Sequence, residues 1–184
     1  LRIALAVLLT VVLLCAAAFA VYVSIYYHGE PAAVQAMASG DTVSVYELRD
    51  GVTVFAPEDP LAGFIFYPGG KVEHTAYAPL LRACAERGML CVLIRMPCNL
   101  AVSNVNGADG IREQFPDIER WYIGGHSLGG AMAASYAAGH SDELDGLVLL
   151  AAYSTQDLTG SGLAVPSVYG SEDGVLDMGK YEQY

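Results

Sequence analysis

The segment Gly125-His126-Ser127-Leu128-Gly129 places a serine between two glycines in the pattern G-x-S-x-G. In this pattern the serine sits on a strained turn between a strand and a helix, and its hydroxyl projects from the end of the sheet. The glycines are required because side chains at Gly125 and Gly129 would collide across the tight turn. A serine hydroxyl becomes a nucleophile when a base removes its proton. The segment therefore predicts Ser127 as the nucleophile of an acyl-transfer site.

The residues on either side of the motif fit the two elements that such a turn connects. Residues 120–124 form a short apolar stretch, which predicts a strand leading into the turn. Residues 131–138 are mostly small and predict a helix leading out of it, with Gly139 as its end. Strand, turn and helix thus follow one another in the order that the motif requires.

Strands and helices are expected to alternate through the rest of the chain. A hairpin is predicted by the turn Arg49-Asp50-Gly51 between two short strand-like stretches. The strands are expected at residues 42–47, 52–55, 62–67, 89–96, 147–152 and 164–169, and helices at 75–87, 108–114 and 178–184. This alternation predicts an α/β fold with a mostly parallel sheet and helices on both faces, over a single domain at residues 42–184.

An uncharged stretch over residues 3–27 precedes this domain. It is longer than the ~20 apolar residues that a helix needs to cross a bilayer. Tyrosines 22, 26 and 27 lie near its end, where aromatic rings favour the membrane interface. The sequence therefore predicts a transmembrane anchor over residues 1–27 and a linker over residues 28–41.

Orientation and processing of the anchor rest on fewer residues. Arg2 lies on its N-terminal side, which predicts a single-pass membrane protein with an extracytoplasmic catalytic domain. A cleaved signal peptide is the alternative, because Ala18-Phe19-Ala20 resembles a cleavage site. The apolar stretch continues beyond that site, and this favours the uncleaved anchor.

Charge and composition exclude several classes of partner. The net charge is −11 with only nine Lys and Arg residues, so we expect no nucleic-acid partner. The chain contains no metal-ligand spacing, dinucleotide fingerprint or P-loop, and we expect neither a metal nor another cofactor. Three cysteines fall in the domain, at positions 84, 91 and 98. A Cys84–Cys91 or a Cys91–Cys98 bridge is open from their spacing, and Cys15 lies in the apolar stretch.

Residues 63–173 resemble the α/β-hydrolase superfamily, and among its members the small lidless proteins grouped as α/β-hydrolase fold family 5. Three features carry the resemblance, in chain order. They are an apolar strand running into a Gly-rich loop at residues 64–71, the serine motif at residues 125–130, and a strand ending in G-x-x-D at residues 168–173.

The resemblance implies a role for each matching residue. Ser127 would be the nucleophile, and the carbonyl that it attacks would become an oxyanion held by backbone N–H groups. One N–H would come from Leu128, and the other from Gly70 or Lys71 in the Gly-rich loop. Asp173 would be the carboxylate of the triad.

Two further carboxylates are alternatives for this role, and the histidine is expected outside the sequence. Asp157 follows the preceding strand, at an acid position that some relatives use, and Glu172 is the third candidate. The superfamily order is serine, acid, histidine, but residues 174–184 contain no histidine. We expect the base, together with a last strand and helix, beyond residue 184. Among the histidines present, His74 is the first alternative.

These features predict a membrane-anchored serine hydrolase that cleaves a carboxylic ester or related acyl bond of a small-molecule substrate. An acyltransferase, in which an alcohol replaces water, would use the same residues. A non-catalytic binding module on the same scaffold is the alternative from another class. A histidine following a final strand would separate the enzyme from the binding module.

Overall fold

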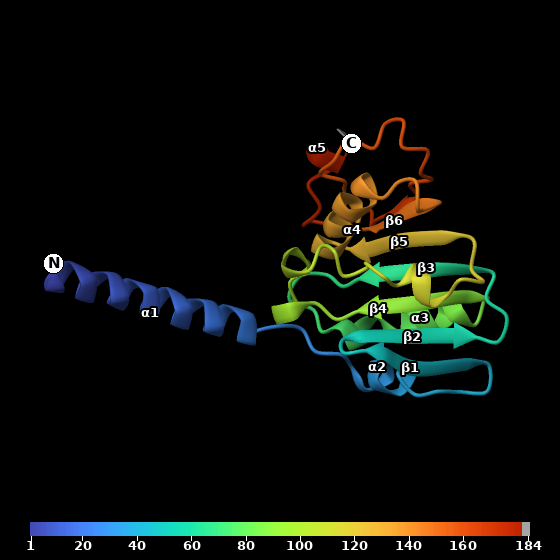
Figure 1. Ribbon diagram of the computed structural model, residues 1–184, viewed down its shortest axis with the longest axis horizontal. Helices are drawn as coiled ribbons and strands as arrows, with labels where there is room; N and C mark the ends of the chain where they lie inside the picture. The colour runs from blue at the N-terminus through green and yellow to red at the C-terminus, as the bar shows by residue number, and fades with distance from the viewer. Residues whose placement is uncertain (182–184) are drawn as a thin grey trace.

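The computed structural model describes residues 1–181. Seven strands form one sheet in the order β1-β2-β4-β3-β5-β6-β7 (Figure 1). Their bounds are β1 (Val43–Arg49), β2 (Val52–Pro57), β3 (Ala62–Tyr67), β4 (Met89–Ile94), β5 (Trp121–His126), β6 (Gly146–Leu150) and β7 (Ser167–Val168). β1 and β2 form the expected antiparallel hairpin, β2 pairs antiparallel with β4, and all other pairs are parallel. The predicted mostly parallel sheet is confirmed.

Five α-helices and four short 3₁₀ helices accompany the sheet in the described part of the chain. The α-helices are α1 (Arg2–Ser24), α2 (Pro31–Ala36), α3 (Ala78–Ala85), α4 (Leu128–Gly139) and α5 (Met178–Tyr181). The 3₁₀ helices are η1 (His74–Tyr77), η2 (Pro97–Asn99), η3 (Ala101–Ser103) and η4 (Arg112–Gln114). The helix expected at residues 178–184 is described only as far as Tyr181, because residues 182–184 lie outside the described part.

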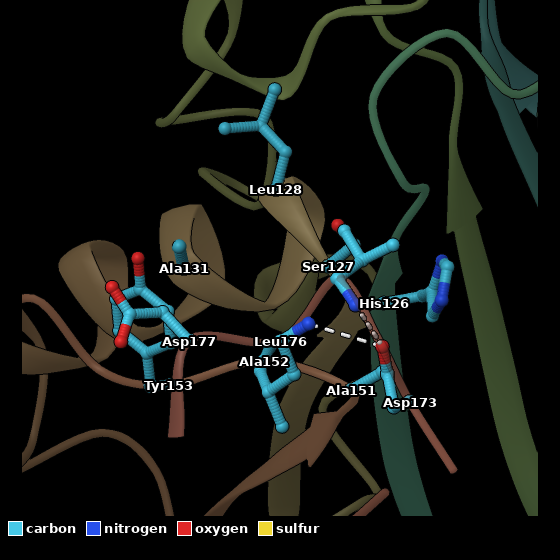
Figure 2. A pocket seen from close by; sticks show the side chains of 11 residues that line it. His126, Ser127, Leu128, Ala131, Ala151, Ala152, Tyr153, Asp173, Leu176 and Asp177 are labelled. Atoms are coloured by element: carbon cyan, nitrogen blue, oxygen red, sulfur yellow. Dashed lines mark hydrogen bonds between the residues drawn. The ribbon is translucent and has the colours of Figure 1, made fainter. Parts of the chain in front are cut away.

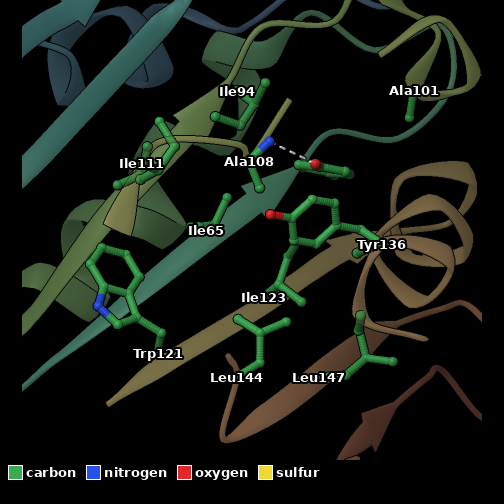
Figure 3. Packing of buried hydrophobic residues seen from close by; sticks show 14 of the residues in the cluster. Ile65, Ile94, Ala101, Ala108, Ile111, Trp121, Ile123, Tyr136, Leu144 and Leu147 are labelled. Atoms are coloured by element: carbon green, nitrogen blue, oxygen red, sulfur yellow. Dashed lines mark hydrogen bonds between the residues drawn. The ribbon is translucent and has the colours of Figure 1, made fainter. Parts of the chain in front are cut away.

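Helices cover both faces of the sheet, as the alternation of buried side chains along β3 shows. Ile65 belongs to the core beneath α4, together with Trp121 and Ile123 of β5 (Figure 3). Phe64 and Phe66 belong to a second core beneath α3. Successive side chains of a strand point to opposite faces, so each face of β3 packs against its own helix. β3 is therefore buried on both faces.

Two predicted elements are reduced to a few residues, and each has a local cause. The strand expected at residues 164–169 is reduced to β7 and an isolated bridge at Ala164, because Pro166 between them has no N–H for the ladder. The helix expected at residues 108–114 is reduced to η4. Gly110 interrupts it with a φ of 71°, which is not a helical conformation.

The N-terminal helix ends earlier than residues 3–27 predict. α1 ends at Ser24, buries none of its residues and projects away from the sheet (Figure 1). It is long and apolar enough to cross a membrane, and its position near the N-terminus also suits a signal sequence. Beyond it, Tyr27 forms a parallel bridge with Val72 of the domain. The helix does not extend as far as Tyr27, because the N–H and the carbonyl of Tyr27 bond to the backbone of the domain instead.

The segment expected as a linker, residues 28–41, includes a helix that packs on the domain. Ala33 and Ala36 of α2 are buried. The guanidinium of Arg82 on α3 donates from Nε to the Ala36 carbonyl at 3.0 Å and from Nη2 to the Ala38 carbonyl. A side chain of the domain therefore satisfies the carbonyls at the end of α2.

Candidate active site at Ser127

Ser127 lies between the end of β5 and the start of α4, in a backbone conformation that residues other than glycine rarely adopt. Its φ is 51° and its ψ is −122°. The Ser127 N–H donates to the Leu150 carbonyl of β6 at 2.9 Å, and its carbonyl accepts from the Ala131 N–H of α4 at 3.1 Å. Such a conformation costs energy and persists only where the surrounding structure fixes it. The prediction of a strained turn at Ser127 is confirmed.

The two glycines of the motif are sterically required in the folded chain. A Cβ atom at Gly125 would lie 2.5 Å from the carbonyl carbon of Gly129. A Cβ atom at Gly129 would overlap the carbonyl oxygens of Tyr67 and Pro68 at the end of β3. The first turn of α4 therefore crosses close to both β5 and β3, which only glycine allows.

Two backbone N–H groups near Ser127 are free to bind an oxyanion. Within residues 1–181, the N–H groups of Leu128 and Gly70 have no hydrogen-bond partner. The two residues are neighbours, since a Cβ atom at Gly70 would lie 3.0 Å from Cδ2 of Leu128. The Lys71 N–H instead donates to the Asn99 carbonyl at 2.7 Å. Of the two loop residues expected for this role, the geometry favours Gly70.

Asp173 lines the same pocket as Ser127 (Figure 2). The pocket has a volume of about 480 Å³ and is lined by His126, Ser127, Leu128, Ala131, Ala151, Ala152, Tyr153, Asp173, Val175, Leu176 and Asp177. Oδ1 of Asp173 accepts hydrogen bonds from the N–H groups of Val175 (2.8 Å) and Leu176 (3.0 Å). These two bonds lower the pKa of Asp173, because they stabilise its charged form. The nearby His126 lowers it further.

Asp157 lines a different pocket. That pocket is bounded by β7 and by the segment after β6, and only Tyr153 lines both pockets. Oδ1 of Asp157 accepts from the Thr159 N–H at 2.9 Å. Hydrogen bonds from Thr159 lower the pKa of Asp157 as well, so its charge state does not separate the two acids. The positions of the two acids do separate them, because the structure places Asp173, and not Asp157, in the pocket that Ser127 lines.

His126 is held by a tyrosine that the sequence did not single out for the site. The Tyr77 hydroxyl lies 2.9 Å from Nδ1 of His126 and accepts from the Gly69 N–H at 3.0 Å. Burial lowers the pKa of His126, and the nearby Asp173 carboxylate acts in the opposite direction. Tyr77 therefore joins the serine turn to the Gly-rich loop. In the sequence Tyr77 fell within the helix expected at residues 75–87, and nothing there indicated that its half-buried hydroxyl would find a partner in the site.

The other three histidines lie away from the Ser127 pocket. His74 lines a cavity beside Arg95, and burial lowers its pKa, with Arg95 as the next cause. His28 pairs with Glu73, with 3.4 Å between Nδ1 and Oε2. His140 stacks on Tyr136 of α4. Figure 2 shows the His126 ring turned away from the Ser127 hydroxyl.

The described residues 1–181 contain no group of three His, Cys, Asp or Glu side chains that could hold a metal ion. All four cysteines are free thiols in the structure. Neither the Cys84–Cys91 nor the Cys91–Cys98 bridge is formed.

Comparison with known proteins places this geometry in a family. Residues 63–184 match the model of the alpha/beta hydrolase family. No curated protein matches the sequence.

Solved structures share the fold at low sequence identity. The protein TT1662 from Thermus thermophilus superposes with a TM-score of 0.63 at 16% identity, over 78% of this chain and 81% of that one. A dienelactone hydrolase from Anabaena variabilis gives 0.59 at 16% identity, over 72% and 76%. A bacterial heroin esterase gives 0.51 at 18% identity, over 65% of this chain and 48% of that one. With the strained serine turn, the sheet order and the family match in agreement, the chain belongs to the alpha/beta hydrolase family.

Proposed function

We propose that this protein is a serine hydrolase that cleaves a carboxylic ester or related acyl bond through an acyl-enzyme on Ser127. The observation that carries the proposal is the strained Ser127, which lines one pocket with Asp173. The names of two similar structures, a heroin esterase and a dienelactone hydrolase, agree with ester chemistry.

The first half of the reaction forms the acyl-enzyme. The Ser127 oxygen attacks the substrate carbonyl carbon while a base takes the hydroxyl proton, and the carbonyl oxygen becomes an oxyanion. The free N–H groups of Leu128 and Gly70 would bind that oxyanion, each contributing about 3 kcal/mol to the transition state. The tetrahedral intermediate then collapses, and the alcohol leaves with the proton held by the base.

The second half releases the acid. Water attacks the acyl-enzyme carbonyl, the same base takes its proton, and the Ser127 oxygen leaves as the hydroxyl. The carboxylate of Asp173 would orient the base and stabilise its charged form. The hydrogen bonds from the Val175 and Leu176 N–H groups support this role, because they lower the pKa of Asp173 and favour its charged form. A histidine later in the chain than Asp173 remains our prediction for the base.

We further propose that α1 anchors the protein in a membrane with the hydrolase domain on the extracytoplasmic side. The anchor would comprise residues 1–27 and the domain residues 42–184. The length and apolar character of α1, none of which is buried, support this arrangement.

Hydrolysis of p-nitrophenyl acetate by the full-length protein tests the reaction. We expect turnover that is lost in Ser127→Ala and retained in Ser135→Ala, because Ser135 lies on α4 outside the pocket. Equal turnover by both variants would contradict the proposal. Ester binding without turnover by the native protein would favour a non-catalytic binding module, and transfer of the acyl group to an added alcohol in preference to water would favour an acyltransferase.

A further inference from the structure

The helix α1 leaves the domain at the edge of the sheet that carries Ser127. β3, β4 and β5 are parallel and their arrowheads point to the edge from which α1 projects (Figure 1). Ser127 follows the end of β5, and Gly70 lies in the loop after β3. The catalytic edge and the end of the apolar helix therefore share one side of the molecule.

The connection between α1 and the catalytic loop is short and fixed by hydrogen bonds. Tyr27 lies three residues after the end of α1, a distance of about 10 Å at most. Its N–H donates to the Lys71 carbonyl at 2.8 Å, and its carbonyl accepts from the Glu73 N–H at 2.8 Å. Lys71 directly follows Gly70, whose N–H faces the oxyanion position in the proposed reaction. The backbone that follows α1 is thus paired with the loop after Gly70 through one parallel bridge, between Tyr27 and Val72.

Side chains also attach the last turn of α1 to this edge. The Lys71 ammonium lies 4.3 Å from the centre of the Tyr22 ring. Val23 and Tyr26 line a cavity of about 360 Å³ whose other wall includes His74 and Arg95. Tyrosine rings and basic groups at the end of a membrane-length helix lie where lipid headgroups would be. These contacts hold the end of α1 beside the loop that follows β3.

The same edge exposes apolar side chains. Tyr27 is 76% exposed, Val102 of η3 is 54% exposed, and Val175 at the mouth of the Ser127 pocket is 92% exposed. Apolar groups in this position would gain free energy on entering the acyl boundary of a bilayer. We propose that the Ser127 pocket opens onto the bilayer surface and takes carboxylic esters of membrane lipids as its substrates. This inference rests on the proposed hydrolase function and on the anchor.

The test compares two substrates of the full-length protein in phosphatidylcholine vesicles. Umbelliferyl oleate dissolved in the bilayer reports on membrane-held esters, and p-nitrophenyl acetate in the aqueous phase reports on the catalytic machinery. The native protein should hydrolyse both. A flexible Gly/Ser spacer of roughly twelve residues between Ser24 and Ile25 would lift the domain by about 20 Å. We expect the spacer to lower oleate hydrolysis roughly tenfold or more and to leave acetate hydrolysis unchanged.

A pair of exposed residues gives a second measurement. Val102→Asp places a charge on the proposed membrane face and should lower the oleate-to-acetate ratio roughly tenfold. Leu61→Asp is the matched control, because Leu61 is 69% exposed and precedes β3 at the opposite edge of the sheet. Its ratio should remain that of the native protein.

The outcomes separate the two proposals. If neither ester is hydrolysed by the native protein, the proposed function fails. If acetate is hydrolysed but the spacer and Val102→Asp both leave the ratio unchanged, the hydrolase stands and the bilayer-facing pocket is overturned. If Val102→Asp and Leu61→Asp lower the ratio equally, the effect is one of surface charge and the proposed face is also overturned. If the spacer variant does not insert into the vesicles, the oleate-to-acetate ratios of Val102→Asp and Leu61→Asp test the proposed face on their own.

Discussion

The residues around Ser127 divide into those that local sequence predicts and those that only the fold brings together. The need for glycine at positions 125 and 129 follows from the sterics of one tight turn, so the motif was sufficient to predict it. The choice of Gly70 over Lys71 was not accessible in this way. It depends on a bond from the Lys71 N–H to Asn99, a residue that follows a different strand.

The two candidate acids can be separated by one matched pair of variants. Asp173→Asn should lower kcat for p-nitrophenyl acetate on the order of 10³- to 10⁴-fold, because an amide cannot orient and stabilise a charged base. Asp157→Asn should leave kcat within about threefold of the native value, since Asp157 lines another pocket. Steady-state kinetics, with circular dichroism to confirm folding, provide the comparison. A larger loss in Asp157→Asn would reverse the assignment of the acid.

At the scale of elements, hydrophobic patterns predicted well which segments are buried strands, but predicted poorly where helices and strands end. Phe64 to Phe66 form a continuous apolar run, and the run is buried on both faces as expected. The end of α1 at Ser24 was not predictable from residues 25–27, which remain apolar. It goes with two backbone hydrogen bonds far along the chain: the Tyr27 N–H donates to the Lys71 carbonyl, and the Glu73 N–H donates to the Tyr27 carbonyl. Contacts between distant segments decide such boundaries, and local propensity does not contain them.

The crossing of α4 over β3 gives a prediction about stability. Gly129→Ala should destabilise the domain by roughly 3 kcal/mol or more, because its Cβ atom would overlap the carbonyls of Tyr67 and Pro68. A lowering of Tm by roughly 10 °C in thermal unfolding would correspond to this loss. Gly139→Ala is the control on the same helix, since a Cβ atom there would meet nothing within 4 Å. Equal Tm values for the two variants would show that the close crossing is absent.

At the scale of the whole molecule, composition predicted the division into an apolar helix and an acidic domain, but not how they join. α2 packs on α3 within the segment expected as a linker, because Ala33 and Ala36 are small enough to be buried there.

Extraction of membranes with alkaline carbonate tests the anchor. The full-length protein should stay in the membrane pellet, because a helix with no buried residues and a membrane-spanning length stays in the bilayer. Deletion of residues 1–24 should move the domain to the soluble fraction. N-terminal sequencing of the pelleted protein distinguishes the alternatives. A mature chain that begins immediately after Ala20 would contradict the anchor.

The central claim is that Ser127 is the nucleophile, and its covalent labelling tests this most directly. A fluorophosphonate forms a stable bond only with an activated serine, so peptide mass spectrometry of the treated full-length protein should find the adduct on Ser127. Ser127→Ala should abolish labelling, and Ser135→Ala should be labelled at the native rate. An adduct on another serine, or undiminished labelling of Ser127→Ala, would contradict the account.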